Sequence, residues 1–228
     1  MAGRRRALAA AGAMLLALAG CEAGGLGGGS APAPLTRAVL ADGTVTVSGP
    51  EGYCIDPRTL SRGAARNFAL IASCQALSEG ASGFWVEPVL VTVTVGRAGA
   101  GSDLPSAEGF AQTEGARLLA SGTTGGLLTA NLDRGGEDRL DGGDPRHWRG
   151  AFVLNGRLVM LALYAPQGSE YAAARGGRML SQVKDQITAL SAARTDPVVP
   201  QAPAAAATQP PKKPGGLFGR LFNPKDLP

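Results

Sequence analysis

The segment HWRGAFVLNGRLVMLALYA, residues 147–165, decides the fold, because it contains two apolar runs joined by a turn. The runs cover residues 147–154 and 157–165, and the dipeptide Asn155-Gly156 separates them. A two-residue type I′ turn requires positive φ at both central positions, and Asn-Gly is the pair that most readily adopts it. The segment therefore predicts an antiparallel β-hairpin.

Further strands are predicted on the N-terminal side of this hairpin. Residues 89–95 (VLVTVTV) are rich in β-branched side chains and form the clearest single strand of the chain. Short strands are expected at residues 44–47 and 53–55, where a Gly-Pro pair and other turn residues bound the apolar positions. Residues 123–132 are also typical of a strand, which Gly125-Gly126 breaks near its start.

Three helices are predicted from their capping residues. Asp56-Pro57 is typical of an N-cap with proline at the first helical position, so a helix is expected from there towards Leu77. Ser106 similarly precedes a helix extending to about Ala120. Ser169 is expected to cap a long final helix, whose apolar face repeats at three- and four-residue steps through Leu180, Val183, Ile187 and Leu190.

This order of elements predicts an α+β fold, in which a largely antiparallel sheet packs with about three helices. The hairpin GAFVLNGRLVMLALY followed by the amphipathic segment AARGGRMLSQVKDQI resembles the end of the PsbP-like fold. The resemblance covers the last fifty or so residues of the domain and has no diagnostic motif. Because PsbP-like proteins are mostly non-catalytic accessory proteins, it implies an accessory role and assigns no site residues.

The N-terminus has the pattern of an export signal. Three arginines at positions 4–6 precede an apolar run, which ends in Leu18-Ala19-Gly20-Cys21. The last four residues resemble the lipobox of bacterial lipoproteins, and the chain as a whole resembles small uncharacterised proteobacterial lipoproteins with a GYCIDP-type segment. The resemblance implies cleavage before Cys21 and attachment of acyl chains, palmitate included, to that cysteine. Since Glu22 follows rather than Asp, it also implies an outer-membrane location facing the periplasm.

Composition and charge exclude other classes of protein. Cleavage after residue 20 removes three arginines and leaves a net charge of +1, which argues against a nucleic-acid partner. None of the four lysines follows a glycine, so a phosphate-binding P-loop is excluded. The expected organisation is a signal peptide at 1–20, a flexible lipidated tether at 21–34, one domain at 35–194 and a disordered Pro/Ala-rich tail at 195–228.

Cys54 and Cys74 are the two cysteines left after lipidation of Cys21. An even remainder in an oxidising compartment predicts one disulfide between them. A redox-active pair would need a Cys-x-x-Cys spacing, which the chain lacks.

Two other segments could carry chemistry. His147 is the one histidine of the chain, and no signature of a nucleophile or metal site accompanies it, so a position at the surface or packed in the hairpin is favoured over a catalytic role. The loop from Asp133 to Asp144, DRGGEDRLDGGD, holds five acidic residues that could suit Ca²⁺. However, it lacks the EF-hand pattern and contains two arginines, so a solvated loop is favoured.

The tail ends in the short apolar sequence LFGRLF, where Leu217, Phe218, Leu221 and Phe222 would share one helical face. We expect it either to dock on a partner or to be a simple chain end.

Taken together, these features favour a non-enzymatic envelope lipoprotein that binds or scaffolds an envelope protein and is attached to the membrane through a lipid anchor. It requires no cofactor and no metal. The alternative is an envelope hydrolase using His147 and a nearby carboxylate. The oligomeric state is not predicted.

Overall fold

The computed structural model describes residues 32–64, 66–99 and 104–195. Cys21, the signal peptide, most of the tether and the LFGRLF segment with Leu217, Phe218, Leu221 and Phe222 lie outside the described residues. The described strands are β1 (Ala38–Leu40), β2 (Val45–Val47), β3 (Tyr53–Ile55), β4 (Ser61–Arg62), β5 (Arg66–Ser73), β6 (Leu90–Gly96), β7 (Leu118–Thr124), β8 (Leu127–Leu132), β9 (His147–Leu154) and β10 (Arg157–Tyr164). The helices are α1 (Cys74–Leu77), α2 (Ala107–Glu114) and α3 (Ala174–Thr195).

One antiparallel sheet of eight strands organises these elements, in the order β3-β5-β6-β10-β9-β8-β7 with β4 paired to β5. The predicted α+β class, an antiparallel sheet with three helices, is confirmed. The predicted hairpin is also confirmed: β9 and β10 pair with Leu154 opposite Arg157, and Asn155 and Gly156 have φ values of 50° and 70°. The predicted strand at 89–95 is β6, which lies between β5 and β10.

The predicted helix from Asp56 to Leu77 is wrong. Asp56 does cap a helix, but only the single 3₁₀ turn Pro57–Thr59, and the chain then forms β4, β5 and the four-residue α1. β5 is flanked by strands on both sides, and its sequence RNFALIAS contains five consecutive apolar residues at 68–72, although Ala69 and Ile71 lie in the main core while Phe68 and Leu70 are only half-buried. Such a run does not distinguish a buried strand from a helix buried over much of its girth.

The strand predicted at 123–132 is confirmed for residues 127–132, which are β8, but Gly125 and Gly126 form the turn of a second hairpin, β7–β8, rather than a break within one strand. Their φ values are 56° and 79°, which match a two-residue turn. α2 ends at Glu114, earlier than expected, because Gly115 takes the left-handed conformation of a helix C-cap. The final helix starts at Ala174 rather than directly after Ser169.

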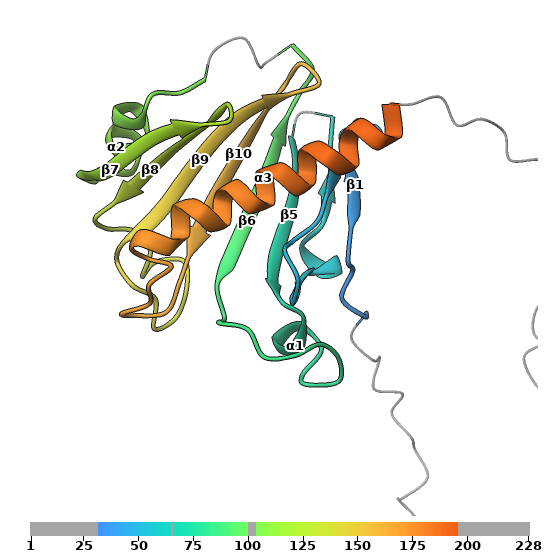
Figure 1. Cartoon of the computed structure of the whole chain (residues 1–228), viewed down its shortest axis with the longest axis horizontal. Helices are drawn as coiled ribbons and strands as arrows, with labels where there is room; N and C mark the ends of the chain where they lie inside the picture. Colours follow the sequence, from blue (N-terminus) through green and yellow to red (C-terminus); the bar gives the residue numbers. More distant parts are fainter. Residues whose placement is uncertain (1–31, 65, 100–103, 196–228) are drawn as a thin grey trace, which may run out of the picture.

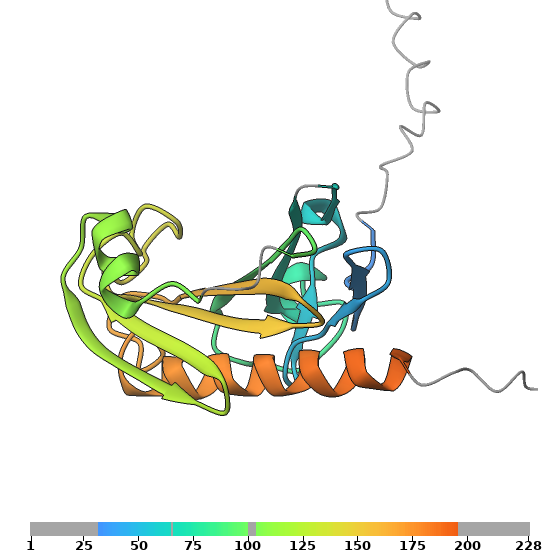
Figure 2. The ribbon, with the colours of Figure 1, turned by 90° about the horizontal axis from the view of Figure 1, so that it is seen from above.

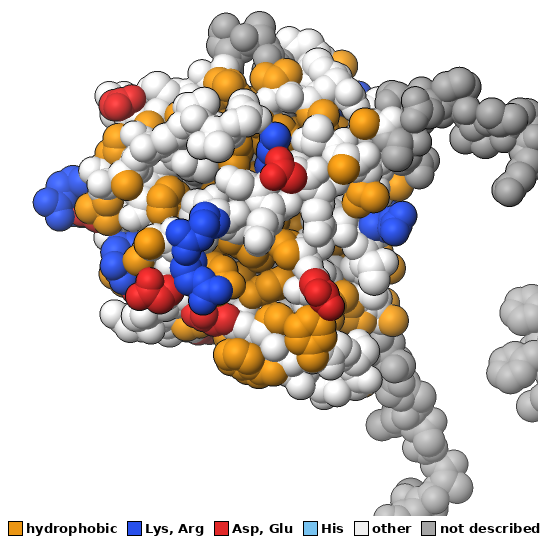
Figure 3. Space-filling model, in the orientation of Figure 1, with side chains coloured by type: hydrophobic (Ala, Val, Ile, Leu, Met, Phe, Trp, Pro, Cys, Tyr) orange, Lys and Arg blue, Asp and Glu red, His pale blue; other side chains and the backbone are white. Residues whose placement is uncertain are grey.

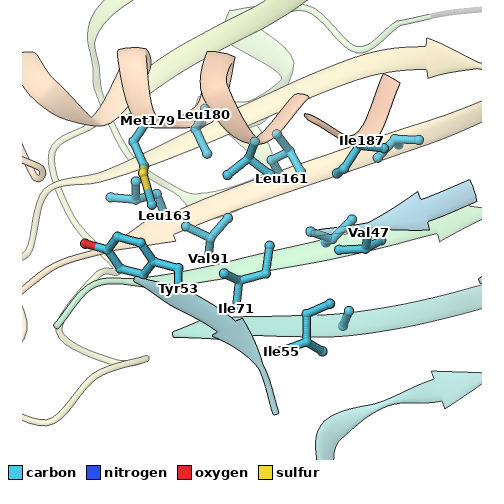
Figure 4. Packing of buried hydrophobic residues seen from close by; sticks show 14 of the residues in the cluster. Val47, Tyr53, Ile55, Ile71, Val91, Leu161, Leu163, Met179, Leu180 and Ile187 are labelled. Atoms are coloured by element: carbon cyan, nitrogen blue, oxygen red, sulfur yellow. The ribbon is translucent and has the colours of Figure 1, made fainter. Parts of the chain in front are cut away.

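The helices cover the two faces of the sheet. α3 crosses one face along its whole length, whereas α2 lies on the other side beside β7 and β8 (Figures 1 and 2). Between α3 and the sheet lies the main core, where Leu180 and Ile187 of α3 face Val91, Ile71 and Leu161 (Figure 4). A smaller cluster joins α2 to the opposite face through Phe110, Ala111, Ala130, Leu132 and Ala151.

The two-stranded sheet β1–β2 joins the start of the domain to its end. Thr46 of β2 donates its backbone N–H to Ser191 Oγ of α3 over 2.9 Å. Ser191 Oγ in turn donates to the carbonyl of Ile187 at 2.6 Å, so both groups are satisfied although they are buried. The C-terminal half of α3 is therefore fixed by the first hairpin of the domain.

Candidate functional site

A hollow of about 540 Å³ opens at the end of the sheet where four segments meet. These segments are the β1–β2 turn, the β4–β5 connection, the end of β6 and the start of β10. We call it the arginine hollow, because three of its lining residues are arginines. Its lining consists of Val39, Leu40, Ala41, Asp42, Gly43, Arg62, Gly63, Ala64, Asn67, Arg97, Ala98 and Arg157.

The β1–β2 turn forms one wall in a conformation that L-residues rarely adopt. Ala41 and Asp42 have φ values of 54° and 57°, and Gly43 donates its N–H to the carbonyl of Leu40 at 3.2 Å. A left-handed conformation costs a non-glycine residue roughly 1–2 kcal/mol, and less for aspartate. The surrounding structure must therefore hold the turn in place.

Asn67 of β5 provides that support. Its Oδ1 accepts the backbone N–H of Ala41 at 3.1 Å, and its Nδ2 donates to the carbonyl of Gly63 at 3.0 Å. Asn67 is buried, and its hydrogen bond to Ala41 forms away from solvent, whereas the one to the exposed Gly63 is only partly shielded. One side chain thus fixes two turns that line the hollow.

The three arginines differ in how far they are already engaged. Arg157 is buried; its Nη1 donates to the carbonyl of Gly96 at 3.2 Å, and its Nη2 lies 3.6 Å from the carboxylate of Asp42. Arg62 is exposed and donates from Nε to the carbonyl of Val39 at 3.0 Å. Arg97 is exposed, and its side chain has no hydrogen bond or ion pair with another described residue.

This arrangement suits binding of an anion. Asp42, the one acidic residue of the lining, has a side chain 93% exposed, so its pairing with Arg157 is weak. The hollow therefore keeps an excess of positive charge, and a guanidinium matches the geometry of carboxylate or phosphate oxygens. The described lining contains no histidine, cysteine, serine, threonine or lysine, and its one carboxylate, Asp42, is almost fully exposed and pairs with Arg157, so the arginine hollow is better suited to binding than to acid–base chemistry.

His147 lies away from the hollow and is completely buried. Its ring stacks on Tyr164 with centroids 5.4 Å apart and an interplanar angle of 21°. The acidic loop covers it, because a Cβ atom added at Gly135 would lie 3.5 Å from His147 Cε1. Burial, and then the positive charge of Arg149, lower the pKa of His147, so its neutral form is favoured at neutral pH.

The geometry around His147 does not match an acid–base dyad. Neither ring nitrogen has a hydrogen bond of ordinary geometry, although the backbone of Pro145 and of Arg134 lies close enough to act against the lowering of its pKa. The carboxylate that most affects it belongs to Glu114 of α2, and that carboxylate forms an ion pair with Arg149. The favoured role in hairpin packing agrees with this placement, although the histidine lies in the interior rather than at the surface.

The acidic residues at the two ends of the Asp133–Asp144 loop are paired with arginines. Asp133 accepts from Arg117 Nε at 2.8 Å. Asp144 accepts from Arg146 Nη2 at 2.9 Å and from the N–H of Gly168 at 2.9 Å, and these contacts lower its pKa to about 2. Within the part of the chain that the structure describes, no group of three or more potential metal ligands comes together.

Cys54 of β3 and Cys74, the first residue of α1, form a disulfide with their Cα atoms 4.8 Å apart. The bridge fixes the edge strand β3 to the beginning of the segment that follows β5.

Sequence reasoning missed the arginine hollow. Arg62, Arg97 and Arg157 lie on separate segments, and only the sheet topology brings them together. The local signal that was available is Asp42-Gly43, a dipeptide typical of hairpin turns, which places one wall of the hollow.

No protein-family model matches the chain, and no curated protein or solved structure shows detectable similarity to it. The resemblances to lipoproteins and to the PsbP-like fold therefore stay predictions. Among the helices within residues 32–195, none combines the length and apolar character needed to cross a membrane.

Proposed function

We propose that this protein is a lipid-anchored lipoprotein of the outer membrane, on the periplasmic side, and that its domain is a non-catalytic binding module. The observation that supports a binding role most directly is the arginine hollow, which brings three guanidinium groups together beside a single exposed carboxylate. Its ligand is an anionic group, carboxylate or phosphate, on another envelope component. Such a site would recognise and hold a partner rather than transform it.

Isothermal titration of the full mature chain with pyrophosphate and with citrate tests the hollow. The double variant Arg62→Gln/Arg97→Gln removes two exposed guanidiniums whose side chains contribute little to packing. Charge-assisted hydrogen bonds are worth about 1.5–3 kcal/mol each, so we expect at least a tenfold loss of affinity. Raising the ionic strength to about 0.15 M should also weaken binding, because the site is open to solvent.

The matched control is Arg178→Gln, which neutralises an exposed arginine on α3 outside the hollow. If this control loses as much affinity as the double variant, binding is a general effect of charge. Equal affinity in the native chain and the double variant would show that the hollow is not the site.

The anchor is tested separately by Cys21→Ser. We expect loss of lipid labelling and release of the protein from the outer-membrane fraction, because acyl chains supply the attachment. A variant that still fractionates with the outer membrane would show that another part of the chain attaches it.

The proposed docking role of Leu217, Phe218, Leu221 and Phe222 is tested by a chain ending at Pro214. We expect fewer envelope partners in a pull-down, since a buried Leu or Phe side chain is worth roughly 1.5–3 kcal/mol before the cost of ordering the segment. Identical partner lists would leave the segment without a docking role.

A further inference from the structure

An exposed aromatic pair, Phe84 and Trp85, lies in the segment between α1 and β6. The two side chains are 52% and 72% exposed, which are the highest values among the large hydrophobic residues of the described chain. In Figure 3, hydrophobic side chains gather at the lower end of the molecule, over this segment. The other tryptophan, Trp148, is buried and donates its indole N–H to the carbonyl of Ala173 at 2.8 Å.

The aromatic pair is held by contacts on both sides. On its N-terminal side, Ser78 Oγ bonds both the N–H and the carbonyl of Ser82, at 2.9 and 3.1 Å, and the disulfide fixes Cys74. On its C-terminal side, Val86 packs against the main core, and the carbonyl of Glu87 accepts the Tyr53 hydroxyl at 2.8 Å. Two exposed aromatic rings on a segment fixed in this way form a defined surface.

Close packing beneath the pair depends on a glycine. A Cβ atom added at Gly52 would lie 2.5 Å from Val86 Cγ1 and 3.2 Å from the Phe84 ring. The segment therefore rests directly on the backbone at the start of β3. A larger residue at position 52 would displace the aromatic pair.

The pair lies at the same end of the domain as the start of the described chain. Leu35 exchanges two backbone hydrogen bonds with Ile55 of β3, at 2.9 and 2.7 Å, and the N–H of Cys74 donates to the carbonyl of Gly52 at 2.9 Å. Figure 1 shows the start of β1 and α1 together at this end, whereas α3 ends at the other. From Cys21 to Pro32 the chain advances eleven residues, which can span at most about 40 Å.

We propose that Phe84 and Trp85 rest in the interface of the phospholipid bilayer to which Cys21 is anchored. This inference depends on the lipid anchor of the proposed function. A short tether keeps this end of the domain near the bilayer, where the effective concentration of the surface is high. Tryptophan favours that environment, because its ring is apolar while its N–H can bond to headgroups or water.

The contact is apolar rather than electrostatic. Residues 80–86, GASGFWV, carry no charge. Glu79, which precedes this segment, and Glu51, which precedes the Gly52 beneath it, are exposed. No basic residue lies within residues 79–87 of the sequence. Membrane contact should therefore depend little on salt or on the fraction of anionic lipid, in contrast to anion binding in the arginine hollow.

The contact also orients the domain. Within β5, Asn67 lies at the arginine hollow and Ser73 precedes α1, so the two ends of this stretch are about 20 Å apart along one strand. A bilayer contact at the α1 end turns the hollow away from the membrane. The anion it binds is then carried by a component in the periplasm rather than by the headgroups beneath the domain.

The test uses the lipidated full mature chain in vesicles of phosphatidylethanolamine and phosphatidylglycerol, with tryptophan emission quenched by phospholipids brominated in the acyl chains. We expect a shift of emission to shorter wavelength and quenching that Trp85→Phe abolishes. The matched control Leu119→Ser changes an exposed residue of β7, on the opposite edge of the sheet, and should leave the quenching intact. Changing the salt concentration or the phosphatidylglycerol fraction should also leave it intact.

Flotation of the same vesicles distinguishes a failure of the proposed bilayer contact from a failure of the proposed lipid anchor. Protein that floats with the vesicles but shows no quenching of Trp85 overturns the bilayer contact and leaves the anchor in place. Protein that does not float, in lipidated form, overturns the anchor. Burial of Trp85 that occurs only after envelope extract is added, and not in pure lipid, would overturn the bilayer contact in favour of a protein partner.

Discussion

The disulfide between Cys54 and Cys74 gives the sharpest quantitative prediction for stability. β3 is only three residues long, and it pairs with β5 at the edge of the sheet, with Cys54 opposite Ala72. The bridge closes a loop with a sequence separation of 20. In the chain-entropy model, a crosslink of that span stabilises the folded state by about 3 kcal/mol, because it restricts the unfolded chain.

The perturbation is the double variant Cys54→Ala/Cys74→Ala, compared with the native chain by urea unfolding followed by circular dichroism. With a slope of about 2 kcal/mol per molar urea, the midpoint should fall by roughly 1.5 M. The single variant Cys54→Ala should show nearly the same loss, because either change removes the bridge. Reducing the native chain should reproduce it.

Peptide mapping of the native chain without reductant provides the direct measurement. We expect one linked pair of peptides carrying Cys54 and Cys74. Both thiols found free in protein taken from the periplasm, together with an unchanged urea midpoint in the double variant, would refute the reasoning.

Three further changes test the interior and the turns. Leu180→Ala leaves a cavity between α3 and the sheet and should cost about 2–5 kcal/mol in the free energy of unfolding, measured in urea, while Arg178→Gln on the exposed face should cost little. Gly156→Ala places a Cβ atom at a φ of 70° and should cost about 1 kcal/mol or more; an unchanged midpoint would contradict the tight turn. The pKa of His147 is lowered in the folded state. Its contribution to the free energy of unfolding is therefore fully present above about pH 6.5, and it is lost as the pH falls below that value towards the lowered pKa. His147→Phe should therefore make the free energy of unfolding nearly independent of pH between about pH 5 and 7. The further loss of stability below about pH 4, where Asp144 with its pKa of about 2 becomes protonated, should persist in this variant.

The β9–β10 hairpin was more predictable from sequence than the strand β5. Asn155-Gly156 requires a specific backbone geometry, so the hairpin and its register followed from two residues. β5 was predicted as part of a helix, because Asp56-Pro57 supplied a real cap and the five consecutive apolar residues at 68–72 show no period of two in the sequence. Whether these residues form a strand or a helix depends on the strands that flank β5, and the local sequence does not contain this information.

The same limit applies to the candidate site. Burial of His147 depends on the acidic loop folding over it, and the arginine hollow depends on turns from four segments meeting at one end of the sheet. The cysteine pair was predictable, because the lipobox prediction left two cysteines for one bridge and the predicted compartment favours pairing. Counting arguments of that kind work from sequence, whereas convergence of distant side chains requires the topology.

The hydrogen bond from Thr46 to Ser191 has a consequence for the order of events in synthesis. It joins residues 145 positions apart, near the two ends of the domain. A growing chain cannot form it, or close the core beneath the second half of α3, until nearly the whole domain has been made. Contacts of such long range form slowly, because loop closure precedes any gain from packing. We therefore expect nascent chains that end before residue 180 to remain sensitive to protease, and complete chains to become resistant in a single step.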